Sequence, residues 1–239
     1  MIDQIRPEHI LFLDIETVPK YSDFSDLPDV EKKLWDKKSV FFRTAEKTAE
    51  EVYERAGIYA EFGKIICISA GFIHVEGGER RIRLKSFSGD DEKKLILEFN
   101  LMLKAFGEKK DLSLCAHNGK EFDFPYLARR MLINGIEIPE ILDVAGKKPW
   151  EVKFTDTLDL WKFGDYKHYT SLELLAYIFD IPSPKDDLDG SMVSNVYYEE
   201  KDLSRIVKYC EKDVVTVIQL ILKFKGMELI PEDKIVIVI

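Results

Sequence analysis

Acidic residues recur in three short stretches that lie far apart in this chain of 239 residues, and their order constrains the fold more than any other feature. The stretches are residues 11–19, 117–127 and 209–213, which carry four carboxylates and one tyrosine: Asp14, Glu16, Asp123, Asp213 and Tyr209. Four carboxylates that a fold brings together repel one another unless cations lie between them. Mg²⁺ and Mn²⁺ prefer oxygen ligands of this kind. The sequence therefore predicts a site for divalent cations.

The spacing within these stretches predicts which side chains share a face. Residues 10–15 are apolar around Asp14 and are expected to form a buried strand. Side chains of a strand alternate between its two faces, so Asp14 and Glu16 point the same way. Residues 203–224 have the apolar spacing of a helix, in which Tyr209 and Asp213 at positions i and i+4 lie on one face. Asp123 is expected at the start of a further helix.

Each motif alone is also compatible with a simpler role. The chain has 44 acidic residues, so an Asp-x-Glu or Tyr-x₃-Asp motif arises easily by chance. Taken alone, Asp14 and Glu16 would mark a strand end that meets solvent, and Tyr209 a half-buried aromatic beside a surface acid. Asp14 is harder to explain in this way, because a charge next to an apolar run is costly without a partner. The ordered set is therefore more specific than its parts.

The ordered set resembles the DEDDy-type 3′–5′ exonucleases with a ribonuclease H-like fold, and above all the proofreading exonuclease domain of family B DNA polymerases and their stand-alone relatives. Residues 13–17 (LDIET) resemble the first motif of that group, residues 118–127 (NGKEFDFPYL) the second, and residues 209–213 (YCEKD) the third in its tyrosine form. Residues 171–176 and 185–187 resemble the helix and loop before the third motif. The likeness spans residues 10–225 and implies an α/β protein, in which helices flank a mixed β-sheet.

The resemblance implies two-metal hydrolysis of nucleic acid, with DNA favoured, from a single-stranded or frayed 3′ end to 5′-mononucleotides. Asp14, Glu16 and Asp123 are expected to hold the Mg²⁺ or Mn²⁺ ion that activates water, and Asp14 with Asp213 the ion near the leaving oxygen. Tyr209 is expected to orient the water, because a phenol with a pKa of about 10 is a poor base at neutral pH.

Four further residues are predicted to bind the substrate. Thr17 and Asn118 would touch the terminal nucleotide, Phe122 would pack beneath it, and Lys185 is the fourth candidate. Ribonuclease D and its relatives share the four acids and the tyrosine, so an RNA-trimming enzyme is one alternative. A catalytically silent nucleic-acid-binding module is another, although retention of every carboxylate argues against it, since clustered acids cost stability.

The amino-acid composition is that of a globular protein. A hydrophobic content of 46% and a charged content of 33% are those of a globular protein, expected here as one domain over residues 1–239. The first residues lack the pattern of a secretory signal, and no run is long enough to span a bilayer. Cys67, Cys115 and Cys210 form no C-x-x-C pair and are expected to be reduced packing residues. We therefore expect a cytoplasmic protein without a membrane partner.

The net charge of −9 argues against non-specific binding of long duplexes, which basic residues normally drive. Part of the negative charge lies in the predicted cation ligands, which bound ions would offset. The acidic net charge is more compatible with binding of a few terminal nucleotides through the cations than with binding of a long duplex. Basic residues that remain, most of them expected to be solvated surface, are Lys120, Arg129, Arg130, Lys147, Lys148, Lys153, Lys167 and Lys185.

Periodicity predicts the other elements. Strands are expected at residues 10–15, 64–75, 81–87, 112–116 and 154–158, and helices at 92–106, 124–134, 171–179 and 203–225. Residues 20–62 are an insertion with helices at 28–38 and 48–57, the second opened by a Thr48-x-x-Glu51 capping box. Aromatic residues of the insertion are expected to pack it onto the domain, or to stack on the terminal base. The β-branched tail, residues 234–239, is expected to be a strand of the same domain or to pair with another chain.

Overall fold

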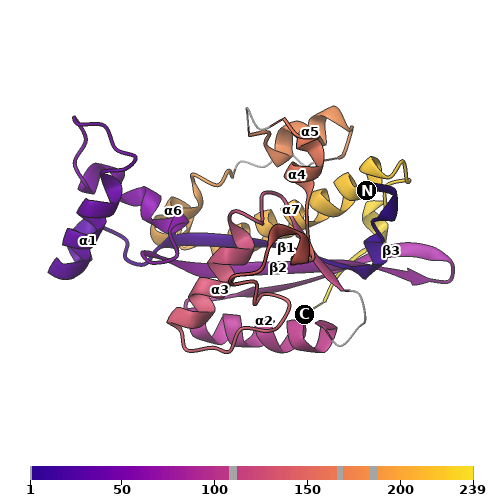
Figure 1. The fold of residues 1–239 in the computed structure, drawn as a ribbon, viewed down its shortest axis with the longest axis horizontal. Helices are drawn as coiled ribbons and strands as arrows, with labels where there is room; N and C mark the ends of the chain where they lie inside the picture. Colours follow the sequence, from indigo (N-terminus) through magenta and orange to yellow (C-terminus); the bar gives the residue numbers. More distant parts are fainter. Residues whose placement is uncertain (1, 108–111, 166–168, 183–187, 239) are drawn as a thin grey trace.

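A six-stranded mixed sheet forms the centre of the molecule (Figure 1). The computed structural model describes residues 2–107, 112–165, 169–182 and 188–238. Its strand order is β5-β4-β1-β2-β3-β6. The strands are β1 (Ile10–Pro19), β2 (Gly63–Glu76), β3 (Glu79–Ser88), β4 (Ser113–Ala116), β5 (Phe154–Asp156) and β6 (Ile235–Ile237). With helices on both faces, this arrangement is the α/β architecture that the sequence predicts.

The direction of each strand follows from its connection. β1, β2 and β3 are antiparallel, and Gly77 and Gly78 at positive φ make the tight turn between β2 and β3. β4 runs parallel to β1 and β5 parallel to β4, so their carboxyl ends share one edge of the sheet. The tail strand β6 runs parallel to β3, with Ile235 opposite Ile82 and Ile237 opposite Leu84. The tail therefore extends the sheet of its own chain.

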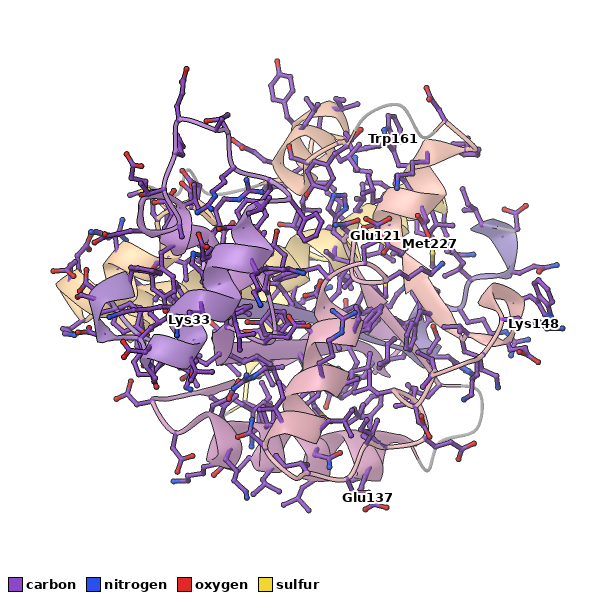
Figure 2. The ribbon with its side chains drawn as sticks, turned by 60° about the vertical axis from the view of Figure 1, so that its left-hand side comes forward. Lys33, Glu121, Glu137, Lys148, Trp161 and Met227 are labelled. Atoms are coloured by element: carbon purple, nitrogen blue, oxygen red, sulfur yellow. The ribbon has the colours of Figure 1, made fainter. Side chains whose placement is uncertain are left out.

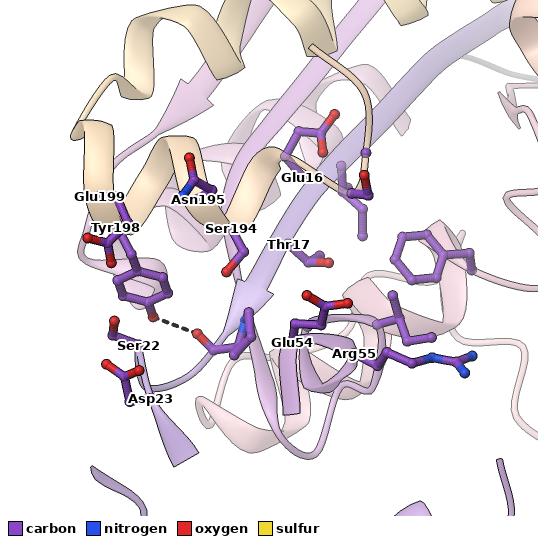
Figure 3. A pocket seen from close by; sticks show the side chains of 17 residues that line it. Glu16, Thr17, Ser22, Asp23, Glu54, Arg55, Ser194, Asn195, Tyr198 and Glu199 are labelled. Carbon is purple, nitrogen blue, oxygen red and sulfur yellow. Dashed lines mark hydrogen bonds between the residues drawn. The ribbon is translucent and has the colours of Figure 1, made fainter. Parts of the chain in front are cut away.

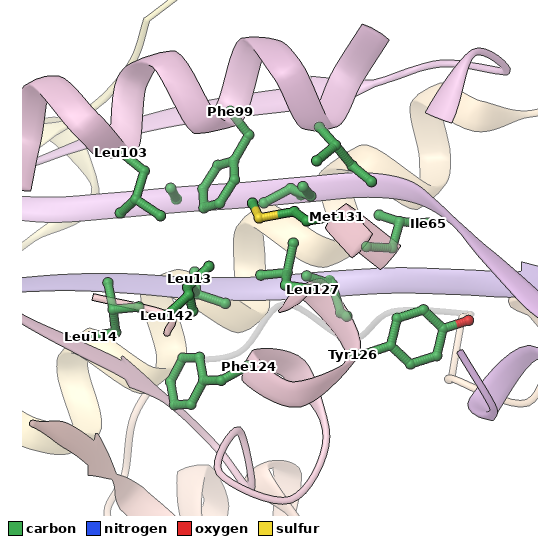
Figure 4. Packing of buried hydrophobic residues seen from close by; sticks show 14 of the residues in the cluster. Leu13, Ile65, Phe99, Leu103, Leu114, Phe124, Tyr126, Leu127, Met131 and Leu142 are labelled. Atoms are coloured by element: carbon green, nitrogen blue, oxygen red, sulfur yellow. The ribbon is translucent and has the colours of Figure 1, made fainter. Parts of the chain in front are cut away.

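Alternation along β1 divides its side chains between two helical layers. Leu11, Leu13 and Ile15 pack toward α2 (Glu92–Gly107) and α3 (Asp123–Ile133), and Figure 4 shows Leu13 within this cluster. Ile10 and Phe12 point to the other face, which α7 (Leu203–Phe224) covers. Asp14 and Glu16 follow Phe12 at the same spacing. They therefore belong to the face of the sheet under α7.

The insertion between β1 and β2 has an aromatic core of its own and projects from one end of the sheet (Figure 1). It contains the 3₁₀ helix η3 (Phe24–Asp26), α1 (Asp29–Ser39) and the 3₁₀ helix η4 (Glu50–Ile58); Lys33 marks α1 in Figure 2. Trp35 is fully buried at its centre and donates its ring N–H to the Ala49 carbonyl (2.8 Å). The predicted capping box is present, since the Glu51 carboxylate accepts from the Thr48 N–H (2.7 Å) and the Thr48 hydroxyl accepts from the Glu51 N–H (3.3 Å).

The segment between β5 and α7 is more helical than the sequence predicts. The strand expected to reach residue 158 ends at Asp156, because the Asp156 carboxylate accepts from the Leu158 and Asp159 N–H groups and starts a helix. The helices that follow are α4 (Thr157–Lys162), α5 (Leu172–Ile178), α6 (Val193–Asn195) and the π-helix η6 (Val196–Glu200). Short 3₁₀ turns lie at Ile2–Gln4, Pro7–His9, Pro149–Glu151 and Glu232–Lys234. None of the described helices is long and apolar enough to cross a membrane.

A buried ion pair fastens α3 to the rest of the fold. The Arg130 guanidinium donates to both oxygens of Glu92 on α2, with a distance of 2.8 Å from Nε to Oε1, and to the Ala60 carbonyl (2.8 Å). Glu92 also accepts from the Ile65 N–H (2.7 Å) at the start of β2. Both side chains are more than nine-tenths buried. The pair therefore holds together α2, α3, β2 and the end of the insertion.

We predict that Arg130→Met lowers the free energy of unfolding by about 3–5 kcal/mol, because it leaves the Glu92 charge buried without its partner. The neighbouring Arg129 is exposed, so Arg129→Met is a matched control expected to change stability little. Urea denaturation of both variants measures the difference. Equal, small losses would show that the buried pair does not stabilise the fold.

Candidate active site

Helix α7 packs on the sheet through two apolar clusters with acidic side chains between them. Toward its carboxyl end, Val214 and Ile218 pack with Phe12. Toward its amino end, Cys210 packs with Val18 and other residues of the sheet. The β1 carboxylates Asp14 and Glu16 and the α7 side chains Tyr209 and Asp213 fall between these clusters and interact electrostatically. The predicted strand and helix pairs therefore face each other across one interface.

Asp123 reaches the same cluster from the first turn of α3. Its Oδ1 atom accepts a hydrogen bond from the Ile15 N–H (3.2 Å), and its side chain is only 3% exposed. Its charge acts on that of Asp14, the strand residue next to Ile15. The structure thus brings together all four predicted carboxylates and Tyr209, although they come from three distant segments of the chain.

Burial and mutual repulsion disfavour the charged forms of these acids. Burial raises the pKa of Asp14 well above its usual range, and the neighbouring charges of Glu16, Asp123 and Asp213 raise it further. Burial, followed by the charge of Asp213, does the same to the pKa of Glu16. The pKa of Asp123 rises to about 7, again chiefly through burial. At neutral pH the cluster therefore needs positive charge to remain ionised.

The donor set fits a hard divalent cation. The Oδ2 atom of Asp14 is buried and has no hydrogen-bond partner among the described residues, which is costly unless something else binds it. Ligand atoms of Asp14, Glu16 and Cys210 lie within 4.8 Å of one another. The Cys210 thiol donates to the Asp14 backbone carbonyl (3.4 Å), and burial raises the pKa of that thiol. The carboxylates of this group supply the oxygen ligands that Mg²⁺ and Mn²⁺ prefer.

These shifts predict how stability depends on pH when divalent cations are absent. A carboxyl has a pKa of about 4 in the unfolded chain, so the folded chain binds more protons than the unfolded chain between about pH 4 and pH 7. The free energy of unfolding is therefore expected to fall as pH rises through this window. Thermal denaturation in chelator measures this decrease, which Asp123→Asn should reduce. Mn²⁺ should raise the melting temperature more at pH 8 than at pH 5, and an equal rise at both would contradict the assignment.

Tyr209 is a hydrogen-bond donor within the cluster. Burial raises the pKa of its phenol far above the usual value, and the charges of Asp213, Glu16 and Asp14 add to the shift. A hydrogen bond to Asp213, one turn further along α7, favours the protonated form as well. The hydroxyl therefore keeps its proton at neutral pH, and it can orient a polar group but cannot accept a proton from it.

Asp156 positions the second motif, a role that we did not predict from the sequence. Its carboxylate is 2% exposed and accepts from the Asn118 and Lys120 N–H groups, each at 3.0 Å. This fixes the loop before Asp123, in which Asn118 has a φ of 62°. His117 is held in the same way, with its two ring nitrogens 2.9 Å from the Thr157 hydroxyl and from the Thr170 carbonyl. Burial lowers the pKa of His117, and these two contacts tie the loop to residues 157 and 170.

A cavity of about 580 Å³ adjoins the carboxylates (Figure 3). Glu16 and Thr17 both line it, at a point where the register between β1 and β2 shifts. Such a bulge redirects neighbouring side chains. Phe122 also lines the cavity, whereas Asn118 does not, and Lys185 lies outside the described residues.

The insertion and the segment before α7 form the outer walls of this cavity. Helix η4 contributes Glu54 and Arg55, and the segment around α6 contributes Ser194 and Asn195 (Figure 3). The Tyr126 hydroxyl on α3 donates to the Gly57 carbonyl (2.8 Å), which ties the η4 wall to the helix of Asp123. The insertion thus reaches the cavity through polar η4 side chains, while the aromatic residues Trp35, Phe42, Tyr53 and Tyr59 pack against one another.

Residues 58–231 match a protein family described as a predicted 3′–5′ exonuclease related to the exonuclease domain of PolB. The chain belongs to this family. The matched range contains Asp123, Tyr209 and Asp213 but begins after Asp14 and Glu16. In the structure, Asp14 and Glu16 of β1 nevertheless lie close enough to Asp123 and Asp213 to interact with them electrostatically.

The fold is also similar to a family B DNA polymerase from the hyperthermophilic archaeon Pyrobaculum calidifontis, with a TM-score of 0.50 and 15% sequence identity. The similarity covers 92% of this chain and 27% of the polymerase chain. At this identity the likeness concerns the fold, and it confirms the predicted ribonuclease H-like architecture. No curated protein sequence matches the chain.

Proposed function

We propose that the protein is a divalent-cation-dependent 3′–5′ exonuclease that hydrolyses nucleic acid, with DNA favoured over RNA, to 5′-mononucleotides. The observation that carries the proposal is the convergence of Asp14, Glu16, Asp123 and Asp213 around an unpartnered, buried carboxylate oxygen. The family match gives the reaction class in which such a cluster works.

Each residue of the cluster has a role in the proposal. Asp14, Glu16 and Asp123 would hold one Mg²⁺ or Mn²⁺ ion, and Asp14 with Asp213 a second. When bound, these ions supply charge stabilisation for the reacting phosphate and acidify water. Tyr209 keeps its proton at neutral pH, and its hydroxyl group would orient the attacking water by hydrogen bonding.

The cavity beside Glu16 would take the terminal nucleoside. Glu16 belongs to both the carboxylate cluster and the cavity wall, so a nucleoside in the cavity has its 5′ phosphate near the cluster. Thr17 would contact the sugar and Phe122 would pack against the nucleotide, since both line the cavity. Asn118 and Lys185 remain further substrate-binding candidates from the sequence.

Matched DNA and RNA oligonucleotides of one sequence, labelled at the 5′ end, test this function. We expect a ladder that shortens from the 3′ end in Mg²⁺ or Mn²⁺, faster for DNA, and no degradation in chelator. Faster degradation of RNA would instead favour a ribonuclease D-like trimming enzyme. Binding of both strands with no hydrolysis would indicate a silent binding module, and full activity in chelator would contradict the cation site.

A further inference from the structure

A second groove lies at the opposite end of the parallel strands from the carboxylates. Its volume is about 740 Å³, and it is lined by the N-terminal segment with Arg6 and His9, by the first residues of β1 and β4, and by Lys153 with Phe154 at the edge strand β5. Ile10 lines it and is four residues before Asp14, which corresponds to about 13 Å along β1. Because residues 10–13 are buried, a bound strand has to follow a longer path over the surface between the two sites. The groove is therefore separate from the carboxylate cluster, but one nucleic-acid strand could contact both.

The charge of this groove is opposite to that of the whole chain. The protein has a net charge of −9. Among the described residues that line the cavity beside the cluster, four are acidic (Glu16, Asp23, Glu54 and Glu199) and one, Arg55, is basic. Among the described lining residues of the second groove, Arg6, His9 and Lys153 are basic and none is acidic. Neither Arg6 nor Lys153 makes an ion pair or hydrogen bond with a described residue. Their charges are thus available to a polyanion.

The segment that leads to Lys153 adds an exposed aromatic ring and more positive charge. Trp150 is 78% exposed, and the Lys148 ammonium lies 5.2 Å from its ring centroid; Figure 2 shows Lys148 at the edge of the molecule. The single acid of this segment, Glu151, turns its carboxylate back onto the Lys148 N–H (2.7 Å). Positive groups beside an exposed ring are the combination that binds single strands, since the ring stacks on bases and the charges follow the phosphates.

The N-terminal segment, which forms the other wall of the groove, is anchored to the rest of the fold. Lys225, just beyond α7, donates to the carbonyls of Ile2 and Asp3 at 3.2 and 3.1 Å. Ile5 packs against the apolar cluster of Ile10 and α7. The chain segment that leads to Arg6 is thereby anchored to the end of α7.

We propose that this groove, with Arg6 and Lys153, forms together with the adjoining segment that carries Trp150 a second nucleic-acid site, which binds the single strand several nucleotides upstream of its 3′ end. The inference rests on the proposed exonuclease function, for which it supplies a route for the rest of the strand. It predicts that long single strands bind more tightly than short ones, although the protein is acidic.

Charge reversal in the groove tests the proposal against a matched pair elsewhere. Arg6→Glu/Lys153→Glu is compared with Lys93→Glu/Lys94→Glu, which makes the same charge change on exposed residues of α2. Fluorescence anisotropy of 5′-labelled dT20 and dT4, in an Asp14→Asn background that prevents degradation, gives the affinities. We expect the groove variant to bind dT20 about tenfold more weakly, with a log K against log salt slope reduced by about 1.4, which corresponds to two lost phosphate contacts. Trp150→Ala should weaken dT20 binding about tenfold through lost stacking.

Affinity for dT4, and its hydrolysis by chains that retain Asp14, should be unchanged in the groove variant. Equal weakening by the α2 pair, an unchanged salt slope, or equal weakening for dT4 and dT20 would each overturn the second site. Hydrolysis of dT4 by the wild type reports separately on the proposed function. Its absence would contradict that function without altering the comparison of binding.

Discussion

Replacing Asp14 or Asp213 with asparagine is expected to reduce exonuclease turnover by about 10³-fold or more, because bound cations contribute several kcal/mol to such reactions. Either change removes an oxygen ligand and a negative charge from the cluster. The folded chain should survive, since losing one of several buried like charges relieves the repulsion that raises the pKa of its neighbours. In chelator at pH 8, both variants should therefore unfold at a higher temperature than the wild type.

Glu232→Gln is the matched control, because it removes one carboxylate charge from an exposed position outside the cluster, in the 3₁₀ turn Glu232–Lys234. It should leave turnover and the melting temperature unchanged. Single-turnover rates and thermal denaturation provide the two readouts. If Asp14→Asn unfolded the chain, loss of activity would carry no information about ligands, and Asp14 would be a structural residue.

Tyr209→Phe is expected to lower the turnover number about 10²–10⁴-fold, the range for groups that handle a proton or orient a reacting group. The phenyl ring keeps its packing against the cluster of Val18 and Ile206, so the fold should not change. Binding of Mn²⁺ should change little, because the phenol keeps its proton and is not among the proposed ligands. The effect should therefore fall on the turnover number.

Tyr177→Phe is the control for this variant, since Tyr177 is 81% exposed on α5. The turnover number and the Mn²⁺ affinity of the two variants are measured side by side. Wild-type turnover in Tyr209→Phe would return Tyr209 to a purely structural role. A large loss of Mn²⁺ affinity would instead place its hydroxyl among the ligands.

The local geometry of the site could be predicted because it depends on short periodicities. Asp14 and Glu16 share a face since β1 alternates, and Tyr209 and Asp213 share a face since α7 repeats every 3.6 residues. The apolar runs around them placed β1 and α7 correctly. That Asp123 joins them came from the resemblance, because nothing local in residues 117–127 indicates which strand they meet.

Features that depend on long-range contacts could not be predicted. Asp156 acts through hydrogen bonds to Asn118 and Lys120, 38 and 36 residues away, so its sequence context shows only a strand end. The same side chain ends β5 and starts α4, which is why the strand is shorter than its apolar pattern indicates. The cavity beside Glu16 likewise exists only because η4 and α6 dock against β1 from different parts of the chain.

The number of Mn²⁺ ions bound at pH 8, measured by electron paramagnetic resonance titration of the wild type and Asp14→Asn, tests most directly whether the carboxylates form one cation site. We predict two ions per wild-type chain, as the proposed two-metal mechanism requires, and a large loss of affinity for both in Asp14→Asn, which replaces the ligand proposed to be shared by the two ions. Glu232→Gln should bind Mn²⁺ as the wild type does. Equal Mn²⁺ binding by the wild type and Asp14→Asn would contradict the assignment of this cluster as the catalytic centre.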